Sequence, residues 1–245
     1  MDQTTDHNQP TLSVVILCYR AGESTRDFVQ KMIAVLQKDG INDYELVLVG
    51  NYHQGSNDTT PQVVQALASQ NPRITTVAMP KQGMMGWDMR SGLDKANGIY
   101  ITVIDGDGQM PVEDVTKVYQ KITAENLDLV KTIRIVRGDG AWRKFISYVY
   151  NTFFKILFPG LNATDINAKP KILRRESLLQ MKLTANDWFI DAEIMIQARR
   201  LKLRIGEVPT NFLGLTGRKS FVKPHAILEF VSNLVRYRFK EWVSK

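Results

Sequence analysis

Apolar and polar positions along the first 110 residues fall into blocks that predict strands and helices in turn. Short apolar runs rich in β-branched residues predict buried strands, and segments with helical spacing of apolar residues predict helices. Strands are predicted at 12–18, 44–49, 74–79 and 100–104, and helices in the segment ending near 37, at 60–69 and at 85–96. Strands that alternate with helices through short connections are typical of a doubly wound sheet. We therefore predict an α/β fold with a Rossmann-like, mostly parallel central sheet flanked by helices.

The second part of the chain, from residue 111, has a different pattern. Its predicted elements are helices at 111–124, 143–158 and about 186–201, strands at 127–136 and 203–209, and a C-terminal helix within 225–243. No internal repeat, low-complexity tract or obvious linker divides the chain. We therefore expect a flexible N-terminus at 1–10, one domain at 11–222 with halves at 11–110 and 111–222, and a C-terminal amphipathic helix at 223–245.

The predicted helix at 143–158 is apolar around most of its circumference. Its main polar residues recur every four positions and form one stripe, consisting of Arg143, Ser147, Asn151 and Lys155. Such a helix is either deeply buried or lies in a membrane interface, and it is too short to span a bilayer. Burial would leave two cations in need of partners, so both interpretations stay open.

Composition and charge narrow the class of protein. The 245 residues are 44% hydrophobic, enough for a substantial core, and they carry a formal net charge of +7. This charge favours anionic partners without distinguishing phosphates, a membrane surface and nucleic acid. The single cysteine, Cys18, excludes an internal disulfide and fits a reducing compartment. Because the N-terminus is polar and no apolar stretch reaches about twenty residues, we expect neither a signal peptide nor a transmembrane helix.

The most informative short segment is Asp105-Gly106-Asp107, which follows a predicted buried strand. Two carboxylates so close together repel each other unless a cation lies between them, and a divalent ion with oxygen ligands suits them. A polar turn that closes the strand is the alternative, since Asp and Gly are common turn residues. Ligands of doubly wound sheets bind at the carboxyl ends of strands, where Tyr19 and Asn51 also fall. The topology therefore favours a site.

Common motifs for binding calcium or phosphate are absent from the sequence. An EF-hand loop is excluded because Met110 and Thr116 occupy the positions that require glycine and glutamate. The sequence has no P-loop and no Gly-x-Gly-x-x-Gly after the first strand. Phosphate charge would have to be neutralised by a metal ion or by basic side chains, such as those of Lys131, Arg134 and Arg137. The alternative for this basic cluster is a solvated edge strand protected by charge.

Together, these segments resemble family 2 glycosyltransferases of the GT-A fold, and more narrowly the polyprenyl-phosphate glycosyltransferases related to dolichol-phosphate mannose synthase. The resemblance runs from residue 12 to about 220 and rests on the order and spacing of motifs that are each weak alone. The matching pieces are Ser13-Val14-Val15-Ile16 with Tyr19, Gly55-Ser56-Asn57-Asp58, Gly86 and Gly92 before Ala96-Asn97-Gly98, Asp105-Gly106-Asp107-Gly108-Gln109, 143–147, Asp165, and Glu207-Val208-Pro209 with Gly217 and Ser220.

The resemblance implies a metal-dependent, inverting hexosyltransferase that moves a sugar from a UDP- or GDP-sugar to a polyprenyl phosphate. It makes 11–110 the nucleotide-sugar half and 111–222 the acceptor half. Asp105 would lie at the diphosphate, and Asp107 with Gln109, beside Asp105, would hold Mg²⁺ or Mn²⁺. Asp165 completes the expected catalytic set as an orienting group, because a phosphate acceptor is already an anion.

The resemblance also assigns binding residues. Those expected at the nucleotide sugar are Cys18, Tyr19, Arg20, Asn51, Asp58, Gly86, Arg90, Asp105 and Gly106. Those expected at the acceptor phosphate are Arg134, Arg137, Arg143, Ser147 and Arg218, since arginine suits a phosphate.

The chain departs from the family pattern at several positions. The usual paired aspartates after the second strand are Gly50-Asn51 here, followed by extra residues at 52–54, so base and ribose recognition stays open. The proline expected at the exit of the first strand is Leu17, and an arginine expected in a late loop aligns with Leu215, near Arg218. The transmembrane helices of some relatives are missing, which implies peripheral attachment at the cytoplasmic face of a membrane.

Three other functions stay in competition. In a transferase to a saccharide hydroxyl, Asp191 or Asp165 would have to serve as the general base. A non-catalytic nucleotide-sugar or anionic-surface binding module is compatible with the same fold. A nucleic-acid partner is not expected, because no recognition motif is present and phosphates already account for the positive charge. A homo-oligomer stays open.

Overall fold

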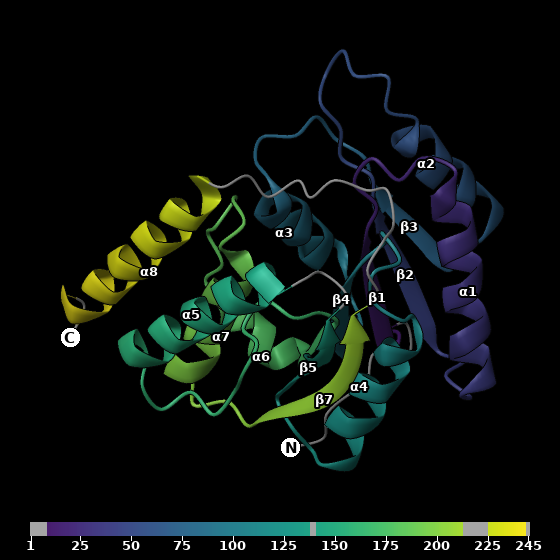
Figure 1. Ribbon diagram of the computed structural model, residues 1–245. Coiled ribbons are helices and arrows are strands. Elements are labelled where there is room, and N and C mark those ends of the chain that lie inside the picture. Colours follow the sequence, from purple (N-terminus) through teal and green to yellow (C-terminus); the bar gives the residue numbers. More distant parts are fainter. Residues whose placement is uncertain (1–8, 138–140, 213–224, 244–245) are drawn as a thin grey trace.

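The computed structural model of the chain describes residues 9–137, 141–212 and 225–243 (Figure 1). The strands are β1 (Leu12–Leu17), β2 (Tyr44–Val49), β3 (Ile74–Val77), β4 (Tyr100–Asp105), β5 (Leu129–Arg137), β6 (Lys171–Arg174) and β7 (Ile205–Phe212). The helices are α1 (Ser24–Lys38), α2 (Thr60–Gln70), α3 (Met85–Lys95), α4 (Glu113–Ala124), α5 (Ala141–Leu157), α6 (Arg175–Leu179), α7 (Ile190–Arg200) and α8 (His225–Val243). The predicted α/β class is confirmed.

The seven strands form one sheet in the order β3-β2-β1-β4-β6-β5-β7. β6 runs antiparallel to its neighbours β4 and β5, and every other pair is parallel, so the predicted mostly parallel sheet is confirmed. In the parallel register, Leu17 of β1 lies opposite both Val49 of β2 and Asp105 of β4. The three strands therefore end level with one another.

Two apolar cores lie on opposite faces of the sheet, because successive side chains of a strand point to opposite sides. Val14 and Ile16 of β1 lie in the core that α1, α2 and α4 cover. Val15 and Leu17 lie in the other core, which α3, α5 and α7 cover. Figure 1 shows the corresponding layers, with α1, α2 and α4 on one side of the sheet and α3 and α7 on the other.

Helices α5 and α8 pack against each other beyond this second layer (Figure 1). Phe154 of α5 and Leu234 of α8 are fully buried. Other apolar side chains of the two helices are exposed: Phe145 by 56%, Tyr148 by 70%, Ile156 by 70%, Phe239 by 65% and Trp242 by 71%. α5 is thus buried on one side and open on the other. Within the described ranges, none of the helices is both long enough and apolar enough to cross a membrane.

Two elements, β6 and α6, were not predicted from the sequence. β6 has only four residues and carries a charge at each end, so neither its length nor its alternation marks a strand. α7 begins at Ile190 and not near 186, because the preceding segment makes its hydrogen bonds with the start of α3. The amide of Gly86, for example, donates to the carbonyl of Asp187 at 2.9 Å.

Candidate active site

The carboxyl ends of β1, β2 and β4 meet at one edge of the sheet. The amide of Cys18 donates to the carbonyl of Val49, and the amide of Gly106 donates to that of Leu17, each at 2.9 Å. The pairing therefore extends one residue beyond the strands and brings the segments that follow them together. In an open α/β sheet this edge is where ligands bind.

The segment after β4 turns sharply and gathers oxygen donors. Asp105 is the last residue of β4, and its side chain is 36% exposed. Gly108 takes a φ of 74°, and the amide of Gln109 donates to Asp107 Oδ1 at 3.0 Å. The turn thus places the half-buried residues Asp107 and Gln109 directly after Asp105.

The oxygen donors of Asp107 and Gln109 are of the kind that Mg²⁺ and Mn²⁺ prefer. Among the described residues, no three His, Cys, Asp or Glu side chains are grouped so as to hold a metal ion. A magnesium-type ion needs no such group, since it is usually held by one or two carboxylates together with substrate phosphates and water. The residues present therefore fit an ion that binds together with a diphosphate.

A buried polar cluster links the segments after β1, β2 and β3. Asn51 is 1% exposed, and its Nδ2 donates to Asp88 Oδ1 and to Ser91 Oγ, at 3.0 Å each. Asp88 forms an ion pair with Lys81, whose ammonium lies 4.3 Å from the centre of the Tyr19 ring. Burial raises the pKa of Asp88, while the ion pair with Lys81 opposes that rise. Where the family has paired aspartates, this chain has an amide that holds a carboxylate supplied by α3.

Three other residues predicted at the nucleotide sugar lie near these strand ends in different environments. Cys18 is 1% exposed, and burial raises the pKa of its thiol to about 12. Arg20 is exposed. Asp58 Oδ1 accepts hydrogen bonds from the amide, at 3.0 Å, and the hydroxyl of Thr60, at 2.5 Å, at the start of α2. Of the three side chains, only that of Arg20 extends into solvent.

Gly86 and Arg90, both in α3, contact the segment before α7. A Cβ on Gly86 would lie 2.5 Å from the carbonyl oxygen of Ala185, so only glycine fits this close approach. Arg90 NH1 donates to the carbonyl of Thr184 at 3.2 Å and to Asn186 Oδ1 at 2.6 Å. Both residues therefore hold α3 against the segment before α7.

Three buried charged residues, Lys169, Lys171 and Asp191, lie beside Asp105. Lys169 Nζ is 3.0 Å from Asp105 Oδ2 and 3.4 Å from Asp191 Oδ2, and Lys171 Nζ is 2.5 Å from Asp191 Oδ1. Burial opposes the charge of Asp191, but Lys169 and Lys171 hold the pKa of this carboxyl below its usual value. Asp191, which the saccharide-acceptor hypothesis needs as a base, is therefore a fully buried carboxylate engaged by two ammonium groups.

Asp165 is held by Arg134. The backbone amide of Arg134 donates to Asp165 Oδ2 at 3.1 Å, and its Nε donates to the same oxygen at 2.7 Å. Its NH2 group forms an ion pair with Asp165 Oδ1. Burial would raise the pKa of Asp165, but these contacts outweigh it and lower the pKa. Arg134, predicted at the acceptor phosphate, is thus joined to the predicted orienting carboxylate.

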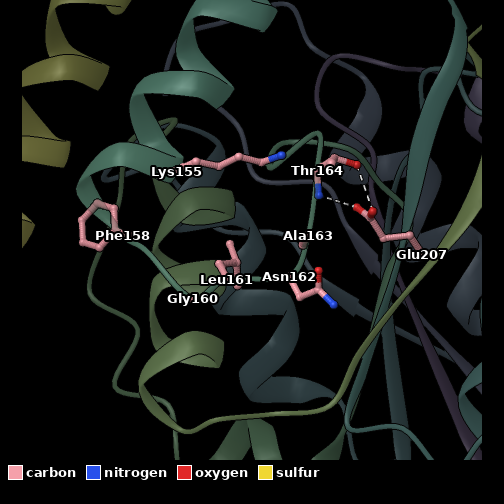
Figure 2. A pocket seen from close by; sticks show the side chains of 8 residues that line it. All are labelled: Lys155, Phe158, Gly160, Leu161, Asn162, Ala163, Thr164 and Glu207. Carbon is pink, nitrogen blue, oxygen red and sulfur yellow. Dashed lines mark hydrogen bonds between the residues drawn. The ribbon is translucent and has the colours of Figure 1, made fainter.

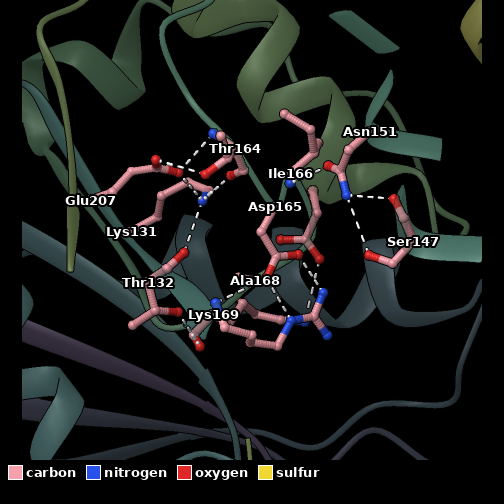
Figure 3. A network of polar contacts seen from close by, with 12 residues as sticks. Lys131, Thr132, Ser147, Asn151, Thr164, Asp165, Ile166, Ala168, Lys169 and Glu207 are labelled. Atoms are coloured by element: carbon pink, nitrogen blue, oxygen red, sulfur yellow. Dashed lines mark hydrogen bonds and ion pairs between the residues drawn. The ribbon is translucent and has the colours of Figure 1, made fainter. Parts of the chain in front are cut away.

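A second network fixes the same loop (Figure 3). Lys131 is fully buried, and its ammonium contacts Glu207 Oε1 at 2.7 Å and the carbonyl of Thr164 at 2.5 Å. Glu207 in turn accepts hydrogen bonds from the amide and the hydroxyl of Thr164, at 2.8 and 2.9 Å. β5 and β7 therefore hold Thr164, the residue before Asp165, through buried polar contacts.

The polar stripe of α5 faces this loop. Asn151 Nδ2 donates to the carbonyl of Ser147 at 2.7 Å, and Asn151 Oδ1 accepts from the amide of Ile166 at 2.9 Å. Lys155 lines a small pocket of about 210 Å³ with Thr164 and Glu207, and its ammonium points toward Thr164 (Figure 2). The side chains of Arg137 and Arg143, and the whole of Arg218, lie outside the described residues.

Sequence reasoning assigned no role to Lys169, Lys81 or Asp88, which pair with predicted site residues or join them. Lys169 lies in a run with another lysine, and nothing in its local pattern indicates burial. A basic residue close to an apolar strand was the only available signal. The pairing with Asp105 depends on the antiparallel strand β6, which was not predicted.

Comparisons with known proteins agree with this geometry. The model of the family described as "Glycosyl transferase family 2" matches residues 13–181. A dolichyl-phosphate beta-glucosyltransferase of Trichomonas vaginalis is 26% identical over 243 residues, which cover 92% of this chain and 72% of that protein. An undecaprenyl-phosphate 4-deoxy-4-formamido-L-arabinose transferase of Pseudomonas aeruginosa is 27% identical over 141 residues, covering 57% of this chain and 40% of that protein.

Solved structures show the same architecture. Glucosyl-3-phosphoglycerate synthase of Mycobacterium tuberculosis, in complex with Mn²⁺, UDP-glucose and phosphoglyceric acid, superposes with a TM-score of 0.72 at 18% identity. The match covers 94% of this chain and 80% of that one. The same enzyme with Mg²⁺ and UDP gives a TM-score of 0.68. This likeness shows the GT-A fold, and because the family model spans more than half of the sequence, the chain belongs to glycosyl transferase family 2 and is a glycosyltransferase.

Proposed function

We propose that this enzyme moves a sugar, with inversion, from a nucleoside-diphosphate sugar to a polyprenyl phosphate at the cytoplasmic face of a membrane. The observation that carries the proposal is the turn with Asp105, Asp107 and Gln109 at the carboxyl end of β4, level with the ends of β1 and β2. The relatives named for dolichyl and undecaprenyl phosphates support the acceptor. The structures with UDP-glucose and UDP make UDP-glucose the first donor to test.

In the donor half, Asp107 and Gln109 would hold the Mg²⁺ or Mn²⁺ ion, whose charge would stabilise the leaving diphosphate. Asp105 would lie at the same diphosphate, with its carboxylate oriented by Lys169. Tyr19 and the cluster of Asn51 and Asp88 lie beside the adjacent strand ends, where the nucleoside would bind.

The acceptor half favours an acceptor that needs no general base. A phosphate oxygen is already anionic near neutral pH and can attack the anomeric carbon on the face opposite the leaving diphosphate, which inverts that carbon. Asp165 is engaged by Arg134 and Asp191 by two lysines, so both carboxylates are committed to cations of the protein itself. Transfer to a saccharide hydroxyl, which requires a base, has less support from this arrangement.

The surface of α5 and α8 supports a lipid-linked acceptor. Tyr148 and Ile156 of α5 and Phe239 and Trp242 of α8 are 65–71% exposed on two helices that pack together. Aromatic and aliphatic side chains of this kind insert into the interfacial region of a bilayer, and the net charge of +7 would add attraction to anionic lipids. We propose this surface as the membrane-contacting face.

A transfer assay tests the proposal. The protein is incubated with Mn²⁺, a panel of UDP- and GDP-sugars and either a short polyprenyl phosphate or a soluble saccharide, and a lipid-linked product is expected. Asp107→Ala should lower turnover by about 100-fold or more, the size of a lost metal contact in the transition state, with an unchanged circular dichroism spectrum. Full turnover in EDTA would contradict the metal-dependent mechanism, and product only on the saccharide would contradict the acceptor.

A further inference from the structure

The ammonium of Lys169 lies inside the donor site. Its Nζ is 3.0 Å from Asp105 Oδ2 and 3.1 Å from the sulfur of Met85, and the residue is 4% exposed. Lys169 and Pro170 directly precede β6, which pairs antiparallel with β4. The antiparallel strand therefore brings a buried cation to the carboxyl end of β4, where the turn with Asp107 begins.

Lys169 is not the only cation beside Asp191. Lys171 already contacts Asp191 Oδ1 at 2.5 Å, whereas Lys169 lies 3.4 Å from Oδ2 of the same carboxylate. The nearer carboxylate for Lys169 is that of Asp105. The ammonium group of Lys169 thus faces two carboxylates, those of Asp105 and Asp191.

We propose that Lys169 is a fixed cation of the donor site that, like the divalent metal ion, offsets negative charge where the diphosphate binds. The ammonium of Lys169 offsets part of the negative charge that Asp105 and Asp107 together place at the turn. A nucleoside diphosphate, which is itself an anion, then meets less repulsion before a metal ion is bound. The proposal rests on the proposed function, because it assumes that a diphosphate binds at this turn.

The same contact has an opposite effect on the metal ion. An ammonium 3.0 Å from Asp105 Oδ2 competes with a divalent cation for that carboxylate. The ion would then be held chiefly by Asp107, Gln109 and the diphosphate. Lys169 thus lowers the affinity for free metal and raises the affinity for nucleotide without metal, and these two effects can be measured separately.

The first measurement is the affinity for Mn²⁺ in the absence of nucleotide, with electron paramagnetic resonance as the readout. Lys169→Met should bind Mn²⁺ about ten-fold more tightly than the wild type, because the competing charge next to Asp105 is gone. Lys169→Arg keeps the charge and should stay close to the wild type. Lys95→Met, which removes an exposed lysine of α3, is the matched control and should change nothing. Equal Mn²⁺ affinity in Lys169→Met and the wild type would overturn the competition.

The second measurement is calorimetric binding of UDP, and of GDP in parallel, with Mn²⁺ and with EDTA. In EDTA, Lys169→Met should bind about ten-fold more weakly than the wild type, and with Mn²⁺ the loss should be less than about three-fold. An equal loss in both conditions would mean that Lys169 only supports the fold, and no loss in either would remove it from the site. Circular dichroism and thermal unfolding of the variant show whether it is folded.

The outcomes separate this proposal from the proposed function. If the wild type binds neither UDP nor GDP even with Mn²⁺, the donor site itself is misplaced, and both proposals fail. If the wild type binds nucleotide and transfers sugar but Lys169→Met behaves like the wild type in both measurements, only the role of Lys169 fails.

Discussion

Charged residues are used differently at the ends of β1, β2 and β4 and in the region near β5 and β7. At the ends of β1, β2 and β4, the carboxylate of Asp105 is 36% exposed and Asp107 is half-buried on a turn. Near β5 and β7, the carboxylate of Asp165 is 11% exposed and engaged by Arg134, and Glu207 is bonded to Lys131 and Thr164. At the first, the carboxylate of Asp105 stays partly exposed although it contacts Lys169, whereas Asp165 and Glu207 hold a loop in place.

Under the proposed function, this difference gives the two regions separate tasks. A carboxylate that is already hydrogen-bonded to an internal cation is poorly suited to take a proton from an acceptor or to bind a metal ion. The loop around Asp165 is instead held in one position, which suits the placement of an acceptor that brings its own charge. Variants of the loop network should therefore affect stability first, and variants of the turn at Asp107 should affect turnover first.

The largest stability effect is expected for Glu207→Ala. It leaves the ammonium of Lys131, which is fully buried, without its carboxylate, and should lower the free energy of unfolding by about 3–5 kcal/mol. Urea denaturation followed by circular dichroism measures this change. Glu125→Ala breaks an exposed pair with Lys121 and should cost less than about 1 kcal/mol. Similar values for the two variants would show that the network near β7 is not a structural support.

A smaller, pH-dependent effect is expected for Asp165→Asn. Asparagine tolerates the φ of 46° at this position but loses the ion pair with Arg134, so the free energy of unfolding should fall by about 2 kcal/mol at neutral pH. Because the pKa of Asp165 is lowered in the folded state, its contribution is present above the unfolded value of about 4 and disappears as the pH falls through the folded value.

Urea unfolding of the wild type and Asp165→Asn at a series of pH values checks this sign. The difference between the two proteins should be constant near neutrality and shrink in acid, where the other carboxylates titrate alike in both. A difference that grows in acid would mean that Asp165 is not the group held by Arg134.

The sequence was sufficient for the first four strands and the helices between them, because each is a local apolar pattern of adequate length. It also located the turn at Asp105 and the polar stripe of α5. It did not predict β6, a strand of four residues that begins with Lys171 and comes shortly after Lys169. The contacts of Lys169 with Asp105 and of Lys131 with Glu207 join distant segments, and only the strand order brings them together.

The exposed surface of α5 and α8, which we propose to contact lipid, differs in character from the ends of β1, β2 and β4. The double variant Phe239→Ser with Trp242→Ser removes two side chains that are 65% and 71% exposed on α8, and should lower binding to anionic liposomes several-fold. Flotation at two salt concentrations measures it, since an electrostatic contribution weakens as salt rises. Leu179→Ser, at an equally exposed site on α6, is the control and should have little effect. Absence of binding by the wild type at both concentrations would favour a soluble acceptor.

The smallest effect is expected at Cys18, because the end of β1 is closed to solvent. The thiol is 1% exposed at the end of β1, and burial raises its pKa to about 12, so hardly any thiolate exists at pH 8. Native protein should therefore react with Ellman's reagent far more slowly than urea-unfolded protein, which should release one equivalent, because the chain has a single cysteine. Saturating UDP with Mn²⁺ should leave the slow native rate unchanged if the end of β1 is already closed without ligand. A rapid native reaction that UDP suppresses would instead show that this strand end opens, and that the donor edge is ordered by its ligand.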